Sequence, residues 1–273
     1  MSQKQIKVAT SQFPVSGDVH KNAKIIRKQM REAAAARADV VHFCETALTG
    51  YAGSCPEYGV PVFDLPTLRD YDWDTLRART HEIMALACDL GVWVILGSTH
   101  YLSESDKPAN CLYIIDDRGK LRNRYDKRFC TPGDLTAYSP GNRYVMTTIH
   151  GFRCGFMICA DEGSPALFRA HKRKGVEVLF HSFYNARFNG PIPNDTYVVP
   201  DMQTKAREHG MWIYGNNSSA RHSCWSTFVA GPDGQFAKLR NIPPPSSTTI
   251  SRPTISPTRA PSTQARRQAI RAR

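Results

Sequence analysis

Residues 155–162 read Gly-Phe-Met-Ile-Cys-Ala-Asp-Glu, an apolar run that stops at Cys159. The run predicts a buried strand that ends at Ile158, and it places a thiol where that strand gives way to a loop. In open α/β sheets, functional sites assemble beyond the carboxyl ends of the strands. A cysteine in such a place is either a small buried apolar side chain or a nucleophile, and this stretch alone leaves both interpretations open.

Two more reactive side chains stand at predicted strand ends. Glu45 follows the short apolar run 40–43, and Lys127 closes the run 121–127. A single Glu or Lys beside a strand is usually solvated or paired with an opposite charge. The three residues together are therefore either an ion pair near an inert thiol or the parts of one site.

The pattern around these residues predicts alternating helices and strands. Apolar residues at helical spacing predict helices at 18–37, 75–90, 165–174 and 201–209. Strands are predicted at 6–13, 40–43, 92–100, 111–116, 121–127, 144–149, 153–158, 176–181, 211–216, 225–230 and 235–239. Residues 46–72 predict a long loop of the kind that builds sites. Strands alternating with helices indicate an α/β fold with sheet in the middle and helices outside.

Composition favours a globular protein. The chain has 273 residues, 41% of them hydrophobic and 22% charged, which is apolar mass enough for a substantial core. Its longest apolar runs fall far short of the ~20 residues of a membrane span. No apolar signal region follows Met1. We expect a cytoplasmic protein with no membrane partner.

Much of the net charge of +12 sits in the last residues. Residues 240–273 hold seven arginines, six prolines and no acidic residue, which leaves a net charge of +5 for residues 1–239. Such a segment cannot bury enough apolar surface to offset its ordering entropy. We therefore expect a folded domain over residues 1–239 and a disordered tail over residues 240–273. Nucleic-acid binding by this tail is an alternative function, but without aromatic stacking partners it predicts only salt-sensitive, non-specific contact.

The eight cysteines do not indicate a disulfide framework or a metal site. No Cys-x-x-Cys pair occurs, and His81-Glu82 lacks the second histidine of a zinc helix. We expect mostly reduced, buried thiols, no structural metal and no cofactor.

The sequence around the three strand-end residues resembles the nitrilase superfamily, the carbon–nitrogen hydrolases. Residues 45–51 resemble the glutamate turn of that family, residues 125–128 its lysine motif, and residues 159–161 its nucleophile elbow. Further stretches match in the same order at 9–13, 139–142 and 232–234. The resemblance covers about residues 5–239, and the joint pattern is specific where each motif alone is weak.

The resemblance implies a four-layer αββα sandwich with a Cys–Glu–Lys triad. Carried over by position, Cys159 is the nucleophile, Glu45 the general base and Lys127 the cationic stabiliser. The family commonly has a second glutamate before the Pro-Gly turn, where this chain has Asp134. Because Asp is one methylene shorter, whether this carboxylate reaches the site is open.

Further residues are candidates for contact with the substrate. Lys127 and the backbone N–H of Ala160 are the candidate donors to a developing oxyanion. Tyr51, His181 and Tyr184 are the candidate substrate contacts, with the segment 181–187 at the mouth of the pocket. Relatives usually carry a bulky residue where this chain has Ala160, and often Arg where it has Glu162-Gly163, so their substrates do not carry over.

The leading hypothesis is hydrolysis of a small-molecule amide by water through a cysteine thioester. Amidases come ahead of nitrilases and N-carbamoyl hydrolases, because the chain lacks the Trp-Glu pair that commonly follows the nucleophile in nitrilases. The alternatives are a catalytically impaired binding protein and a Cys–His hydrolase that uses His181 or His150. The resemblance further implies a homodimer or higher homo-oligomer.

Overall fold

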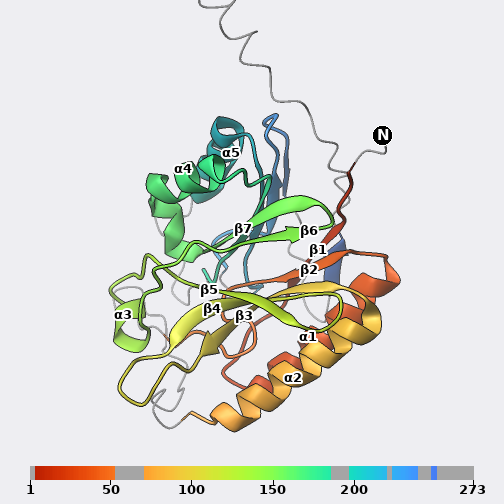
Figure 1. Ribbon diagram of the computed structural model, residues 1–273, viewed down its shortest axis with the longest axis vertical. Helices are drawn as coiled ribbons and strands as arrows, with labels where there is room; N and C mark the ends of the chain where they lie inside the picture. Colours follow the sequence, from red (N-terminus) through yellow and green to blue (C-terminus); the bar gives the residue numbers. More distant parts are fainter. Residues whose placement is uncertain (1–3, 53–70, 186–196, 220–222, 239–246, 251–273) are drawn as a thin grey trace, which may run out of the picture.

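Two six-stranded sheets pack face to face in the protein, and helices cover both outer faces (Figure 1). This computed structural model describes residues 4–52, 71–185, 197–219, 223–238 and 247–250. The four layers are those of an αββα sandwich, so the predicted fold class is confirmed.

The first sheet contains the strands β1 (Val8–Gln12), β2 (Val40–Phe43), β3 (Trp93–His100), β4 (Ala109–Ile115), β5 (Leu121–Asp126) and β12 (Ser247–Ile250). Its strand order is β12-β1-β2-β3-β4-β5. β1, β2 and β3 run parallel, and the two antiparallel pairings on either side of β4 make β5 parallel to them. The carboxyl ends of β2 and β5 therefore lie at the same edge of the sheet.

The second sheet contains the strands β6 (Met146–Ile149), β7 (Phe152–Ile158), β8 (Val178–Ser182), β9 (Trp212–Asn216), β10 (Phe228–Ala230) and β11 (Phe236–Lys238). Its order is β11-β10-β9-β8-β7-β6, with β7, β8 and β9 parallel. Each sheet thus has a parallel centre flanked by antiparallel strands.

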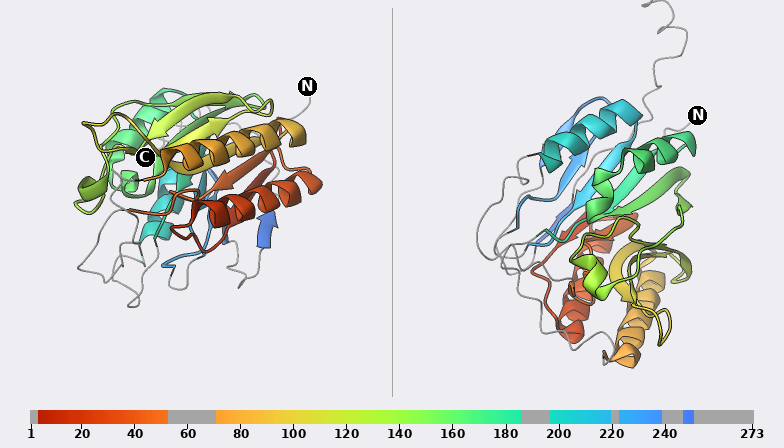
Figure 2. Two further views of the ribbon diagram at one scale, coloured as in Figure 1. Left: turned by 90° about the horizontal axis from the view of Figure 1, so that it is seen from below. Right: turned by 90° about the vertical axis from the view of Figure 1, so that its left-hand side faces the viewer.

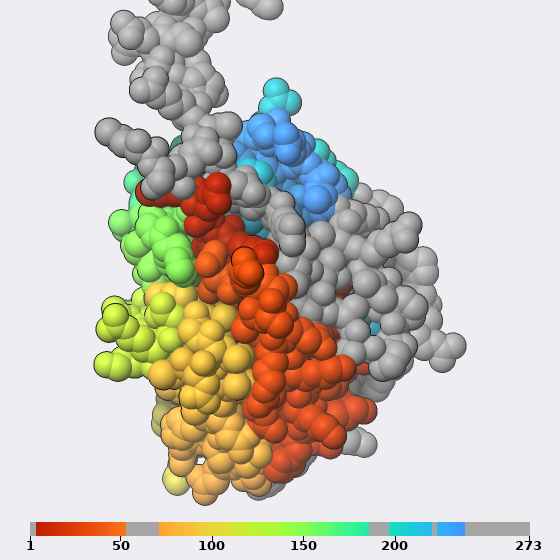
Figure 3. Space-filling model, turned by 90° about the vertical axis from the view of Figure 1, so that its right-hand side faces the viewer, coloured from red at the N-terminus to blue at the C-terminus, as the bar shows by residue number. Residues whose placement is uncertain are grey.

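Helices α1 (Val19–Ala35) and α2 (Trp73–Leu90) cover the first sheet, and α4 (Pro165–Arg173) and α5 (Val198–His209) cover the second. The right-hand view of Figure 2 shows the two helix pairs on opposite sides of the sheets. In the space-filling view, α1 and α2 lie side by side across the outer surface (Figure 3). Asp18 starts α1 as the predicted N-cap, since its carboxylate accepts from the backbone N–H groups of His20 and Lys21.

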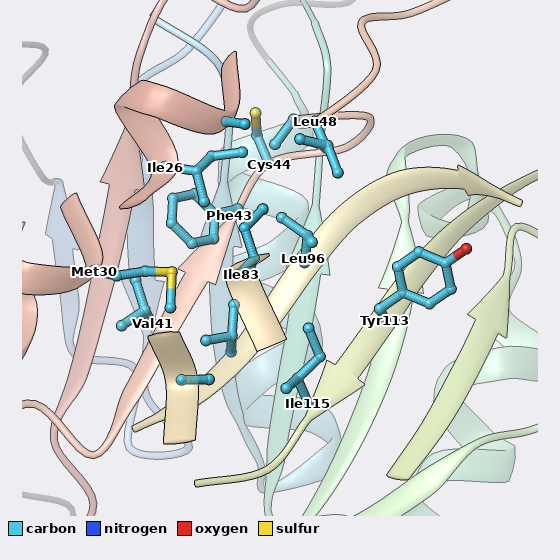
Figure 4. Close-up of a cluster of buried hydrophobic side chains, with 14 of the residues drawn as sticks. Ile26, Met30, Val41, Phe43, Cys44, Leu48, Ile83, Leu96, Tyr113 and Ile115 are labelled. Carbon is cyan, nitrogen blue, oxygen red and sulfur yellow. The ribbon is translucent and has the colours of Figure 1, made fainter. Parts of the chain in front are cut away.

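The alternation of side chains along each strand sorts them between layers. In β2, Val40 enters the core between the sheets, whereas Val41 and Phe43 point toward the helices. Figure 4 shows Val41 and Phe43 against Ile26 and Met30 of α1. Both faces of β2 are buried, so three of its four residues are apolar and the fourth is a histidine.

Polar side chains join the two sheets where their strands end. Asn216 Nδ2 of β9 donates to the carbonyl oxygens of Ser11 (3.1 Å) and His42 (2.6 Å) across the sandwich. Ser182 Oγ of β8 donates to the Phe43 carbonyl (2.9 Å) and lies 2.8 Å from His42 Nε2. These bonds fix the carboxyl ends of the central strands of one sheet against those of the other.

The strand β12 lies inside the segment for which the sequence predicts disorder. Its four residues pair antiparallel with β1, Ile250 lying opposite Ala9. A strand needs only backbone partners, which the free edge of β1 supplies, so low apolar content does not prevent this pairing. The rest of the predicted tail lies outside the described residues, and the division at residue 239 stays a prediction. None of the described helices is both long and apolar enough to cross a membrane.

Candidate functional site

Two side chains from the first sheet form a buried ion pair at its carboxyl edge. Glu45 follows β2 and Lys127 follows β5, and Lys127 Nζ lies 2.8 Å from Glu45 Oε1. Gly97 of β3 makes room for the turn that carries Glu45. A Cβ at Gly97 would lie 1.9 Å from the Cys44 carbonyl oxygen and 2.7 Å from the Thr46 nitrogen. Only glycine lets the turn approach β3 this closely.

The Glu45 carboxylate is held by donors from three elements. Besides Lys127, Asn110 Nδ2 of β4 donates to Oε1 (2.7 Å), and the backbone N–H of Tyr184 donates to Oε2 (2.8 Å). Burial raises the pKa of Glu45 above its ordinary value, and the Asp134 carboxylate adds to the rise against the opposing effect of Lys127. Glu45 is therefore a stronger base than an exposed glutamate.

A second carboxylate holds the other side of the ammonium. The Asp134 Oδ2 atom lies 2.8 Å from Lys127 Nζ, so the shorter side chain does reach the site. Asp134 is the first residue of α3 (Asp134–Ala137), a short helix that the sequence analysis did not predict. Oδ1 accepts from the Tyr51 hydroxyl (2.8 Å), and Oδ2 accepts from the Thr131 N–H (2.8 Å).

The environment shifts the pKa values of the two carboxylates in opposite directions. Burial works against the ionised form of Asp134, but the Lys127 charge and the donated hydrogen bonds outweigh it, and the pKa of Asp134 is lowered. The pKa of Glu45 is raised. Burial likewise opposes the Lys127 ammonium, but the charges around it hold the pKa of Lys127 well above the usual range. The surroundings thus favour the ionised form of Asp134, whereas they make Glu45 easier to protonate than an exposed glutamate.

Cys159 stands at the end of β7, where the chain turns into the 3₁₀ helix η2 (Cys159–Gly163). Its φ of 44° lies in the left-handed region, which a non-glycine residue adopts only where the surroundings hold it. Burial raises the pKa of its thiol well above the ordinary value; the Glu45 carboxylate adds to the rise and the Lys127 ammonium opposes it. Both charges therefore act on the sulfur, and the resting group is a thiol.

The carboxylate of Asp161, two residues after Cys159, accepts four hydrogen bonds. Asp161 Oδ2 accepts from the Tyr125 hydroxyl (2.7 Å) and the Ile158 N–H (2.9 Å). Oδ1 accepts from the backbone N–H groups of Phe129 (2.8 Å) and Arg128 (3.2 Å). The Asp161 side chain is fully buried.

Of the predicted substrate contacts, Tyr51 and Tyr184 lie beside the carboxylates, whereas His181 lies behind the turn of Cys159. The rings of Tyr51 and Tyr184 stack with centroids 5.5 Å apart beside the carboxylates of Asp134 and Glu45. His181 is buried, and its Nε2 lies 3.1 Å from the Cys159 carbonyl oxygen. Burial lowers the pKa of His181 to about 3, so the ring is neutral. The part of segment 181–187 beyond Asn185, and residues 53–70 of the long loop, lie outside the described residues.

The contacts of the histidines weaken the Cys–His alternative. The hydrogen bond of His181 goes to the Cys159 carbonyl, not to the sulfur. His150 lies in the turn between β6 and β7, at the opposite end of the seven-residue strand β7 from Cys159. At about 3.3 Å per residue, that strand separates the two by roughly 20 Å.

One further carboxyl group belongs to this region. The Oε2 atom of Glu162, in η2, is buried and has no hydrogen-bond partner among the described residues. Burial, followed by repulsion from Asp201, raises the pKa of Glu162 to about 8. No group of three His, Cys, Asp or Glu side chains that could hold a metal ion occurs in the described parts of the chain.

The family model for carbon–nitrogen hydrolases matches residues 7–260. The chain belongs to the carbon–nitrogen hydrolase family. The family expected from the sequence is therefore confirmed.

Individual relatives are distant. The chain is similar to a protein of Staphylococcus lugdunensis named "Hydrolase in agr operon", at 29% identity over 58% of this chain and 66% of that protein. The match thus spans just under two thirds of that relative. The chain is also similar to an (R)-stereoselective amidase of Pseudomonas sp., at 23% identity over 71% of this chain and 70% of the amidase.

A solved structure has the same fold. The amidase from Nesterenkonia sp. AN1, in a variant carrying the acetamide moiety of fluoroacetamide on its active-site cysteine, superposes with a TM-score of 0.71. It is 17% identical in sequence over 85% of both chains. At that identity the likeness extends to the fold alone.

This carbon–nitrogen hydrolase thus brings Glu45 and Asp134 against the Lys127 ammonium, and Cys159 ends the strand β7 of the facing sheet. Sequence reasoning missed Asn110, Thr131, Tyr125 and Asp161 as partners of the site. Asp161 stood in the stretch that marked Cys159, and its carboxyl next to a strand end was an available signal. Asn110 and Thr131 offered none, because an amide and a hydroxyl in polar surroundings do not stand out.

Proposed function

We propose that the protein hydrolyses a small amide through a thioester on Cys159, with Glu45 as general base and Lys127 as the cationic stabiliser. The observation that carries the proposal is the buried Glu45–Lys127–Asp134 network, whose charges act on a thiol held in a left-handed turn. The roles rest on the opposite pKa shifts of the two carboxylates, since separated pKa values mark the group that moves protons.

The first step is activation and attack. Glu45 takes the thiol proton, and Lys127 stabilises the thiolate that forms. The sulfur attacks the amide carbon, and the C–S bond forms as the carbonyl π electrons move to oxygen. The backbone N–H of Ala160 and the Lys127 ammonium are the donors to this oxyanion, each typically worth ~10²–10³ in turnover.

The second step releases the amine and then the acid. Glu45 passes its proton to the leaving nitrogen, the C–N bond breaks, and ammonia or an amine departs. Glu45 then takes a proton from water, which attacks the thioester. When the C–S bond breaks, the carboxylic acid leaves and the proton returns to the sulfur. A placed base typically speeds such a step ~10²–10⁴-fold.

Substrate contacts are proposed on the same geometry. The stacked rings of Tyr51 and Tyr184 form a wall beside the carboxylates, suited to a short acyl chain. His181 supports the nucleophile turn through the Cys159 carbonyl. We propose no cofactor, a cytoplasmic protein, and a homodimer or larger homo-oligomer, as the resemblance to the family implies.

The test is turnover by the native protein and by Cys159→Ala on matched amides, nitriles and N-carbamoyl compounds of short acyl chain, with acetamide and butyramide included. We expect ammonia release from the amides first, and a loss of about 10³-fold or more in Cys159→Ala. Equal rates in both proteins would exclude the thioester. Binding of an amide by a native protein that never turns it over would favour the impaired binding protein instead.

A further inference from the structure

A single buried carboxylate connects the nucleophile turn to the lysine segment. Asp161 lies two residues after Cys159, and its side chain turns back to accept the N–H of Ile158, the residue before the nucleophile (2.9 Å). The same oxygen accepts the hydroxyl of Tyr125 from β5 (2.7 Å). This side of the carboxylate therefore holds the turn of Cys159.

The other oxygen of Asp161 holds the segment that carries the ammonium. Oδ1 accepts the backbone N–H groups of Phe129 (2.8 Å) and Arg128 (3.2 Å), the two residues that follow Lys127. Within the described residues, every hydrogen bond between 125–129 and 158–163 ends on this carboxylate. Asp161 is thus the hydrogen-bonded link between the turn of Cys159 and the segment of Lys127.

The conformation of Cys159 makes this support necessary. Its φ of 44° is unfavourable for a residue with a Cβ, and such a conformation persists only where neighbouring contacts fix the peptides on both sides. Asp161 fixes the Ile158 N–H on the preceding side, and His181 lies against the Cys159 carbonyl on the following side.

We propose that Asp161 is a positioning residue that holds Cys159 in its left-handed turn and fixes the Lys127 segment against it. The inference rests on the proposed function, because it gives Cys159 and Lys127 their roles in catalysis. Asp161 acts through these backbone groups and Tyr125, since none of its hydrogen bonds goes to the Cys159 sulfur.

Asp161→Asn is the informative change because the donors lie on both sides of the carboxylate. The amide keeps one oxygen and presents an NH₂ group in place of the other. In either orientation the NH₂ faces backbone N–H donors, so one of the two connections is lost. The side-chain volume stays nearly the same.

The readout is the rate at which iodoacetamide alkylates Cys159, followed on the peptide that contains it by mass spectrometry and measured across pH. In Asp161→Asn we expect this rate and kcat each to fall about 10²-fold, because a small misplacement of a reacting group costs that much. KM should change by less than about threefold. If Asp161 acted only through its negative charge, its removal would favour the Cys159 thiolate and speed alkylation. Slower alkylation therefore indicates a positioning role, and faster alkylation indicates an electrostatic one.

Two matched variants complete the design. Asp116 is also buried, and it accepts the N–H groups of Arg118 (3.0 Å) and Lys120 (2.8 Å) in the turn between β4 and β5, away from the site. Asp116→Ala removes the oxygen that accepts both N–H groups and should lower the melting temperature, while Cys159 keeps its native alkylation profile. Tyr125→Phe removes one of the four donors and should slow alkylation to an intermediate extent.

A folded Asp161→Asn protein whose Cys159 reacts at the native rate would overturn the proposal, as would faster alkylation. If Asp161→Asn does not fold, native alkylation in Tyr125→Phe overturns it, and slowed alkylation supports it. Because alkylation needs no substrate, the result stands whether or not the protein turns over amides. Absence of amide turnover in the native protein would count against the proposed function alone.

Discussion

Lys127 shares its charge between two carboxylates that are not equivalent. Asp134 receives the Tyr51 hydroxyl and the Thr131 N–H in addition to the ammonium, and its pKa is lowered. Glu45 is more deeply desolvated, and its pKa is raised. A buried ammonium with one carboxylate would form a neutral, inert pair. The second carboxylate leaves an excess negative charge, which keeps Glu45 ready to take a proton.

Replacement of Asp134 by Asn tests this division of roles. The Asp134 charge helps to raise the pKa of Glu45, so its removal lowers that pKa. We expect the acidic limb of kcat/KM against pH to move to lower pH, and the maximal rate to fall because Glu45 becomes a weaker base. A limb that stays in place or moves to higher pH would contradict the assignment.

The raised pKa of Glu162 should make the free energy of unfolding depend on pH. Its pKa is about 8 in the folded protein and about 4.5 when exposed, so the fold favours the protonated form. Its contribution to stability is complete below pH ~4.5 and is lost as pH rises through about 8. Relative to the native protein, Glu162→Gln should gain up to about 1.4 kcal/mol of unfolding free energy per pH unit across that window. Urea unfolding at pH 5 and pH 8 measures it; a constant difference between the two proteins would refute the shift.

At the scale of elements, the site depends on how closely the turn after β2 approaches the middle of β3. Gly97 lies against the Cys44–Thr46 backbone, and the Leu48 N–H donates to its carbonyl (3.0 Å). The position of Glu45 is thus set by a neighbouring strand as well as by its own.

Gly97→Ala should disturb this arrangement. Its methyl group would meet backbone atoms, which cannot rotate away, so the Glu45 turn must shift. Overpacking of this kind typically costs about 1–3 kcal/mol, and we expect kcat to fall with stability because Glu45 moves. Gly163→Ala is the stability control, since a Cβ there meets nothing within 4 Å. A Gly97→Ala protein with native melting temperature and kcat would contradict the close approach.

The sequence predicted those elements whose signals are local. Asp18 marked the start of α1, and the apolar run 40–43 is β2 with the same bounds. The helices and strands before residue 239 were expected within a few residues of their observed ends, since periodicity weakens where a chain leaves the core. The short elements α3 and η2 were missed because four or five residues are too few to show a period.

In the candidate site, too, the sequence predicted only what has a local signal. Glu45, Lys127 and Cys159 could be found from the sequence because each stands at the end of a predicted strand. The distances between them could not, because they depend on the stacking of two sheets whose contacts are far apart in the chain. Tyr184 contributes its backbone N–H to Glu45, and a backbone group carries no sequence signal.

At the scale of the whole molecule, His42, His171 and His181 are fully buried between the layers of the sandwich. Burial lowers the pKa values of His42 and His181 to about 3 and that of His171 to about 4. In the unfolded chain these groups titrate near 6.5. They are therefore neutral when folded and charged when unfolded at mildly acidic pH.

The protein should lose stability as pH falls below about 6.5. Each buried histidine contributes a decrease of up to about 1.4 kcal/mol per pH unit, because the unfolded chain binds the extra proton. His42→Gln should reduce the slope of unfolding free energy against pH between 6.5 and 5, whereas His20→Gln, at an exposed position of α1, should not. Equal slopes in the native protein and both variants would show that the His42 ring is not kept neutral by the fold.

The most direct test of catalysis at Cys159 is the mass of the protein during turnover of an amide. Rapid acid quenching followed by peptide mass spectrometry should find the acyl group on the Cys159 peptide of the native protein. Turnover of the amide with no acyl mass on Cys159 at any quench time, or with the acyl mass on another cysteine, would contradict a thioester at this residue.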